Sequence, residues 1–172
     1  TIANGYGYEL AGGILNNGVL TLERVVLADN RVTTGGIEFW KGGGGIYNGD
    51  GSTLTLVEST VRNNSVTGGA GGGVYGFFNT TVTIERSTIY SNTANDVGGG
   101  IRSLGNFTIR NSTISGNRST GWMGGAFFHT DGVMNIINST IANNSAPVDT
   151  TGGGFVGTFT AANATLTLVN TI

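Results

Sequence analysis

Carboxylates are the residues of this chain that come closest to a catalytic pattern. Ten acidic residues are spread over 172 positions and do not recur at one place in a repeat. Glu23 and Glu85 are expected to project from one outer column of a sheet, with Val57 between them, which would separate the two carboxylates by about 9.6 Å. This lies near the upper end of the distances between the two carboxyl groups of inverting glycosidases, about 6.5–9.5 Å. Exposed charge on a sheet face is the commoner explanation, so we predict no catalytic residue and no enzyme.

The single histidine is the second candidate for chemistry. His129, Thr130 and Asp131 are the one place where an imidazole and a carboxylate lie close in sequence. Their spacing would let both side chains point the same way from the end of a strand. No nucleophile motif such as Gly-x-Ser-x-Gly accompanies them. We therefore expect His129 to be a solvated turn residue.

Glycine-rich stretches raise the question of a bound cofactor. The stretches Gly42–Gly45 and Gly68–Gly73 lack the Gly-Lys-Ser/Thr ending of a phosphate loop. They also lack the regularly placed aspartates of a calcium-binding β-roll. The chain has no cysteine, which excludes disulfides and thiolate metal sites. The sequence predicts neither a cofactor nor a metal.

The elements that would position any site are internal repeats. A glycine pair followed by an apolar residue occurs six times. The apolar residues are Ile14, Ile46, Val74, Ile101, Ala126 and Phe155. An alternating strand follows each pair. The strands are centred on Leu22, Leu56, Ile84, Ile109, Ile136 and Leu168. We expect the glycine pairs to supply φ angles that other residues avoid.

An asparagine stands eight residues after each of the first five strand centres. These residues are Asn30, Asn64, Asn92, Asn117 and Asn144. The distance from one strand centre to the next varies between 25 and 34 residues, so only the segment after the asparagine changes length. Fixed strands with one variable corner predict an all-β fold, a right-handed parallel β-helix of about six coils with three short strands each. The asparagines should form a ladder of stacked amides at one corner.

An outward stripe is predicted beside the glycine pairs, because residues one position after an inward residue point outward. The stripe comprises Leu15, Tyr47, Tyr75, Arg102, Phe127 and Val156, with Trp40 and Trp122 extending it from corner loops. Either the corner loops fold over this stripe and cover it, or it is a contact surface for a protein or an aromatic platform for sugars.

Composition excludes several classes of partner. The net charge of −2 offers no footprint for nucleic acid. No apolar run approaches the roughly 18 residues of a membrane span, so no membrane insertion by this segment is predicted. Serine–threonine pairs such as Ser59-Thr60 place the threonines at corners, so we expect no flat Thr-x-Thr face. Binding of ice or mineral therefore ranks last among the hypotheses.

The repeats resemble those of chlamydial-type polymorphic outer membrane proteins and related bacterial surface proteins. The family's motifs read Gly-Gly-Ala-apolar and Phe-x-x-Asn. The matching stretches are Gly45-Ile46-Tyr47, Val61-Arg62-Asn63-Asn64, Ile89-Tyr90-Ser91-Asn92 and Ile141-Ala142-Asn143-Asn144. Leu, Val or Ile replaces the phenylalanine in every copy. The resemblance implies a secreted or cell-surface β-helix, often adhesive, within a longer polypeptide.

These observations favour one β-solenoid over residues 1–172, a non-enzymatic structural or adhesive segment of an extracellular, cell-surface protein or fibre. Thr1-Ile2 and Thr171-Ile172 fall at nearly the same phase of the coil. We therefore expect flanking chain or neighbouring copies to continue it end to end. A surface polysaccharide or a protein of a host or neighbouring cell is a further expected partner. The alternative is a carbohydrate-active β-helix, either a polysaccharide lyase or hydrolase, or a polysaccharide-binding module.

Overall fold

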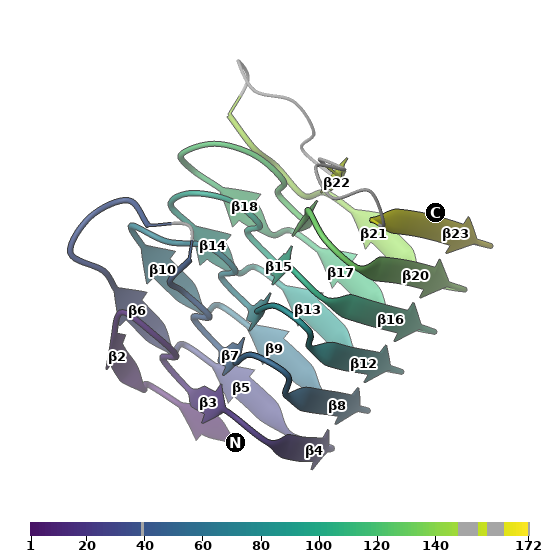
Figure 1. Ribbon diagram of the computed structural model, residues 1–172, viewed down its shortest axis with the longest axis horizontal. Helices are drawn as coiled ribbons and strands as arrows, with labels where there is room; N and C mark the ends of the chain where they lie inside the picture. Colours follow the sequence, from purple (N-terminus) through teal and green to yellow (C-terminus); the bar gives the residue numbers. More distant parts are fainter. Residues whose placement is uncertain (39, 148–154, 158–163, 172) are drawn as a thin grey trace.

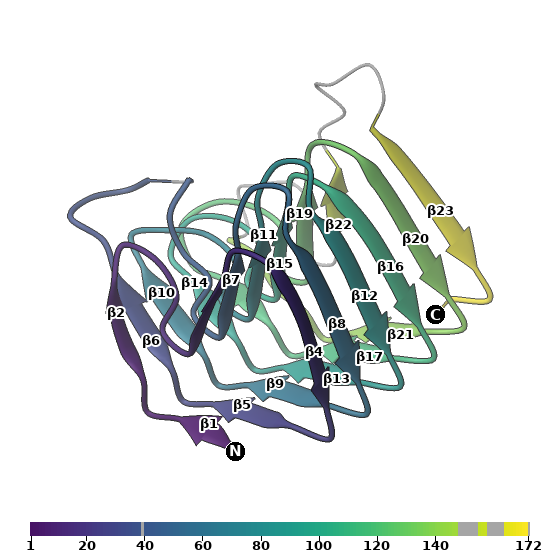
Figure 2. The ribbon, with the colours of Figure 1, turned by 60° about the horizontal axis from the view of Figure 1, so that its bottom comes forward.

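The computed structural model describes residues 1–38, 40–147, 155–157 and 164–171. The chain winds through successive coils, and strands from successive coils stack side by side (Figures 1 and 2). All strand pairs are parallel, and they form four sheets, named sheets 1 to 4 in the order in which a coil passes through them. The described residues contain no helix able to span a membrane.

Sheets 1 and 2 each have six strands. Sheet 1 comprises β3 (Ile14–Asn16), β7 (Ile46–Asn48), β11 (Val74–Gly76), β15 (Ile101–Ser103), β19 (Phe127–His129) and β22 (Phe155–Gly157). Sheet 2 has the longest strands. They are β4 (Val19–Glu23), β8 (Thr53–Val57), β12 (Thr81–Glu85), β16 (Asn106–Arg110), β20 (Val133–Ile137) and β23 (Thr165–Val169).

Sheets 3 and 4 complete each coil. Sheet 3 comprises β1 (Ile2–Ala3), β5 (Val26–Ala28), β9 (Thr60–Arg62), β13 (Thr88–Tyr90), β17 (Thr113–Ser115) and β21 (Thr140–Ala142). Sheet 4 comprises β2 (Tyr6–Tyr8), β6 (Arg31–Thr33), β10 (Ser65–Thr67), β14 (Thr93–Ala94) and β18 (Arg118–Ser119). Loops of varying length connect sheet 4 to the next strand of sheet 1.

The predicted parallel β-helix is confirmed, but the prediction of three strands per coil is wrong. A fourth strand follows four of the five corner asparagines, as β6 follows Asn30 and β10 follows Asn64, and an isolated bridge at Ser145 follows Asn144. Val32 and Val66 point inward from these strands and are buried. In these four coils the variable part therefore begins two or three residues later than the sequence indicated.

The core is a column of apolar side chains inside the coils. Leu56, Ile84, Ile109 and Ile136 are paired in successive strands of sheet 2, and each is fully buried. The predicted register is therefore confirmed. Phe107 and the apolar residues of sheets 1 and 3 fill the rest of this core. Because each coil contacts its neighbours above and below, stability is close to a sum of coil and interface contributions.

The five asparagines form the ladder at the corner between sheets 3 and 4. The Nδ2 of Asn64 donates to the Oδ1 of Asn92 at 3.0 Å and to the carbonyl of Leu27 at 3.1 Å. The Oδ1 of Asn64 accepts from both the backbone N–H and the Nδ2 of Asn30, at 3.0 and 2.9 Å. The same pattern continues through Asn117 to Asn144. The amides are thus buried without loss of hydrogen bonds.

Serines form a second ladder at the corner between sheets 2 and 3. The hydroxyl of Ser87 accepts from the backbone N–H of Ser59 at 3.0 Å and donates to the carbonyl of Glu85 at 2.8 Å. Ser112 and Ser139 repeat this arrangement. Each coil is therefore hydrogen-bonded to the next by side chains at two corners.

The glycine pairs have a different role from the predicted one. A Cβ on Gly45 would lie 2.6 Å from the carbonyl oxygen of Gly73 in the next coil. Positive φ angles are found instead at the residue before the pair, as at Gly43, with φ of 72°, and Gly71, with φ of 66°. The pairs are needed because neighbouring backbones approach too closely for a side chain.

Replacing Asn92 by Ala should destabilise the fold by about 1–3 kcal/mol, because the amide of Asn64 and a buried backbone N–H lose their acceptor. Chemical denaturation measures this change. Asn95→Ala is the matched control, since the Asn95 amide makes only a 3.4 Å hydrogen bond near the surface. Equal midpoints for the two variants would show that the ladder contributes little.

Insertions should be tolerated according to their place in the coil. One residue inserted between Gly35 and Gly36 lengthens an exposed loop, and closure entropy grows slowly with length. One residue inserted after Val57 shifts the strand register, so inward side chains turn outward. The first variant should express and melt like the parent, and the second should not fold. Similar melting of both would contradict the assigned register.

Candidate functional site

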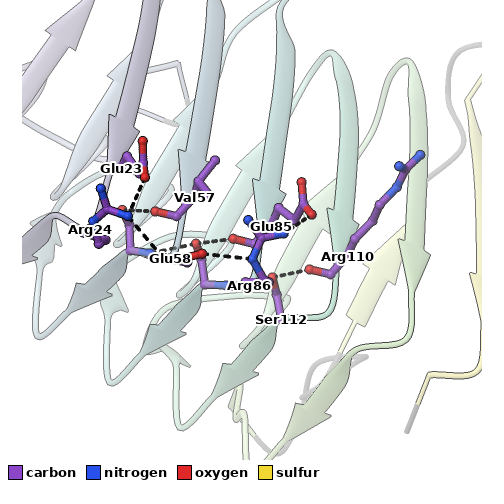
Figure 3. Close-up of polar contacts among 10 residues, drawn as sticks. Glu23, Arg24, Val57, Glu58, Glu85, Arg86, Arg110 and Ser112 are labelled. Atoms are coloured by element: carbon purple, nitrogen blue, oxygen red, sulfur yellow. Dashed lines mark hydrogen bonds and ion pairs between the residues drawn. The ribbon is translucent and has the colours of Figure 1, made fainter.

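Charged side chains line the corner between sheets 2 and 3 (Figure 3). Arg24, Glu58 and Arg86 occupy the same corner position in three coils, all with φ near +50°. The Nη1 of Arg24 lies 3.7 Å from a Glu58 carboxylate oxygen, and the Nε of Arg86 lies 3.2 Å from the other. The column therefore consists of alternating charges that are paired between coils, consistent with a role in fixing register.

Glu23 and Glu85 lie in one column of sheet 2 with Val57 between them, as the sequence indicated. Glu23 pairs with the neighbouring Arg24 at 2.7 Å, and Glu85 pairs with the neighbouring Arg86. Each carboxylate is thus held by a guanidinium of its own coil.

The predicted stripe is wrong by one residue position in the fifth coil. Phe127 pairs with Ile101 and is buried in the main core, so the prediction that Phe127 points outward is wrong. Phe128 takes the outward position beside Arg102. Gly124, Gly125 and Ala126 are all small, so the sequence could not show which two of them align with the glycine pairs.

The outward stripe is covered at Tyr47, Tyr75 and Arg102, which is one of the two alternatives left open above, whereas Leu15 in the first coil is 51% exposed. Tyr75 is fully buried and Tyr47 is 6% exposed. Their rings stack at a centroid distance of 4.9 Å. Ala70, Val97 and other loop residues pack on them in a second apolar cluster. Burial raises the pKa of Tyr47 to about 12 and that of Tyr75 further. Neither phenol is therefore available as a surface contact.

The two tryptophans remain at the surface above this cluster. Trp40 is 48% exposed, and its ring centroid lies 6.5 Å from that of Phe78. Trp122 is 45% exposed and lies 6.3 Å from Phe128. The indoles therefore rest on the partly buried Phe78 and the buried Phe128 and leave part of each ring in solvent. The side chain of Val156 is outside the described part.

A buried charge lies in the stripe, and no local sequence pattern predicts its burial. Arg102 is 4% exposed, and its guanidinium stands 4.7 Å above the Phe128 ring. Its Nη1 donates to the Thr130 hydroxyl at 2.8 Å. Burial lowers the pKa of Arg102 to about 10 and raises the pKa of Asp96, which lies under the same loops. These groups lie inside the second cluster, where a substrate does not reach them.

His129 is buried, so the prediction of a solvated turn residue is wrong. It is fully covered and follows Asn48 and Ser103 in one column of sheet 1. Its Nδ1 lies 3.1 Å from the Ser103 hydroxyl, and its Nε2 lies 3.2 Å from the carbonyl of Gly132. Asp131 turns to its own loop and accepts from the Gly132 N–H. The imidazole is thus held inside the coil by Ser103 and the Gly132 carbonyl.

The outward face of sheet 2 corrects another expectation. Thr53 and Thr55, and likewise Thr81 and Thr83, alternate with inward residues along their strands. Across the strands these threonines pair with each other, and Thr55 and Thr83 continue to Thr21 and Thr108. A Thr-x-Thr face is therefore present, contrary to the prediction from the serine–threonine pairs. Among the described residues, the hydroxyls of this face make no hydrogen bond to protein.

Acid should weaken the fold through His129. Desolvation lowers the pKa of the imidazole, and the nearby Arg102 charge adds to this effect. Protonation therefore favours the unfolded chain, and stability should fall as the pH drops below about 6.5, the unfolded value. Thermal melting between pH 7.5 and 5.5 measures this loss of stability. His129→Asn introduces the residue type that Asn48 has in the same column, and this variant should lose the pH dependence. An unchanged dependence of stability on pH would show that His129 is not its cause.

The chain was compared with known proteins. A family model described as a right-handed β-helix region matches residues 13–171. No curated protein and no solved structure gives a significant match. The family match covers more than nine tenths of the chain, and its description agrees with the stacked parallel coils. This chain belongs to the right-handed β-helix family.

Proposed function

We propose that this chain is a non-enzymatic structural and adhesive β-solenoid of the cell exterior, within a surface protein or an extracellular fibre. The observation that carries the proposal is the state of the carboxylates. Among the described residues, the acids in ion pairs are Glu9, Glu23, Asp29, Glu38, Glu58 and Glu85. A catalytic acid and base need two carboxylates that converge on one substrate.

The remaining described acids do not supply such a pair either. Asp50 accepts from the amide of Asn79 at 3.1 Å, and Asp131 accepts from the Gly132 N–H at 2.7 Å. Asp96 is buried under the corner loops. The described residues also contain no group of three or more His, Asp or Glu side chains able to hold a metal ion. A rigid, sparsely charged solenoid fits a structural role better than catalysis.

The extracellular location rests on the resemblance of the repeats to bacterial surface proteins. The family itself includes many kinds of solenoid, so fold alone does not select a location. The absence of cysteine is compatible with exposure to an oxidising environment, because no thiol needs protection.

A polysaccharide-binding module is the second candidate, favoured by Trp40 and Trp122. Both indoles are about half exposed. Sugar rings stack on such aromatic faces. Under this hypothesis the adhesive ligand is a neutral glycan.

Incubation with neutral and acidic polysaccharides should release no reducing sugar or unsaturated product. Release that depends on Glu23 or Glu85 would overturn the non-enzymatic proposal.

A glycan array tests the second candidate, the polysaccharide-binding module. Trp40→Ala combined with Trp122→Ala should lower glycan retention by about ten-fold if the indoles bind sugar. Tyr6→Ala, which removes an exposed aromatic ring elsewhere, is the control.

A further inference from the structure

The outward face of sheet 2 is the largest regular surface without a cover in the described structure. The loops from sheet 4 lie on the other side of the coils (Figures 1 and 2). They cover sheet 1 and leave sheet 2 open. Parallel sheets usually have both faces covered. Apolar side chains also reach solvent on this face, including Val19 at 85%, Val133 at 38% and Val169 at 42% exposure.

We propose that this face binds a second copy of the same chain. The two copies pack face to face around a two-fold axis that runs along the strands between β12 and β16. The inference names a partner for the structural role proposed above and rests on that role. In this arrangement β12 faces β16 of the second copy, β8 faces β20, and β4 faces β23.

Charge complementarity selects this arrangement. Arg110 is exposed and has no ion-pair partner among the described residues. The two-fold axis brings Arg110 opposite Glu85 of the second copy, and the symmetry produces this contact twice. A symmetric axis through β12 itself would place Glu85 opposite Glu85, which is unfavourable. An axis between β8 and β12 would leave β20 and β23 uncovered.

The neutral side chains agree with the same arrangement. Val57 faces Ile137 of the second copy, so two outward apolar residues cover each other. Thr83 faces Thr108, and Thr55 faces Asn135, so hydroxyl and amide groups that have no partner in one chain meet across the interface. One mismatch remains at the rim, where Glu23 faces Val169 and keeps its contact with Arg24.

The size of the face predicts weak association. Two aligned sheets pack about 10 Å apart, a distance suited to threonine side chains. Six strands of five residues give about 400 Å² for each copy. Stable complexes bury roughly 800 Å² for each partner. The contact therefore resembles a transient interface, which many copies on one surface or fibre would strengthen through multivalency.

Sedimentation velocity over a range of concentrations tests the association. The parent chain should form a weak dimer. Thr83→Arg, at the centre of the face, should weaken dimerisation by at least about ten-fold. Thr113→Arg is the matched control, because Thr113 is an outward threonine on the neighbouring sheet 3 and should leave the dimer unchanged. Melting of each monomer shows whether the variants fold.

Cross-linking tests the arrangement, and the natural chain contributes no cysteine. A mixture of Thr83→Cys and Thr108→Cys proteins should form a cross-linked heterodimer with a short bis-thiol-reactive reagent, since sheets about 10 Å apart are too distant for a direct disulfide. A mixture of Thr55→Cys and Thr83→Cys proteins, which an axis between β8 and β12 would join, should not. Preferential cross-linking of the second mixture would overturn the proposed axis.

Several outcomes would overturn the proposal as a whole. They are a parent chain that stays monomeric at millimolar concentration, a Thr83→Arg variant that dimerises as well as Thr113→Arg, and a monomer that adsorbs to ice or to an insoluble polysaccharide through this face. Each would leave the non-enzymatic role intact, because that role is tested separately by release of sugar products.

Discussion

The asparagine ladder is the interaction on which the rest of this structure depends. In Asn64, Asn92 and Asn117 the amide oxygen accepts two donors from the coil before, and the amide nitrogen donates to that coil and to the next. These bonds fix both the height and the rotation of one coil relative to its neighbour. Because the strands on either side of the corner are then held in place, the loop that follows sheet 4 can vary in length without disturbing the core.

The parts of the fold that the sequence predicted depend on short, constant spacing. Leu22 and Asn30, like Ile84 and Asn92, are eight residues apart, so core column and ladder are visible together. The fourth strand of each coil was missed because its residues differ, as Arg31–Thr33 and Thr93–Ala94 illustrate. Strands of two or three residues with one inward side chain carry little periodic signal.

The sites were harder to predict because they depend on contacts between coils and loops. Phe127 was placed outward through a slip of one residue, which reverses the face of every side chain in a strand. The same slip hid His129, which points inward two residues after Phe127 in β19. The burial of Arg102 depends instead on packing against Phe128 under the loops, and such packing leaves no local pattern. The Thr-x-Thr alternation around Leu54 is visible in the sequence, but the serine–threonine pairs at the corners led to the opposite prediction.

The charged corner shows that stability alone does not determine the outer residues. Arg24, Glu58 and Arg86 have left-handed backbone conformations, which asparagine adopts with less strain and does adopt at Asn111 and Asn138 in later coils. Exposed ion pairs contribute little to folding, so they do not by themselves explain why long charged residues replace asparagine in the first three coils. The alternating signs are better explained by register, since a shift by one coil would bring like charges together. The inner positions of the solenoid are thus determined by stacking, and this outer corner adds a constraint on which coils lie next to each other.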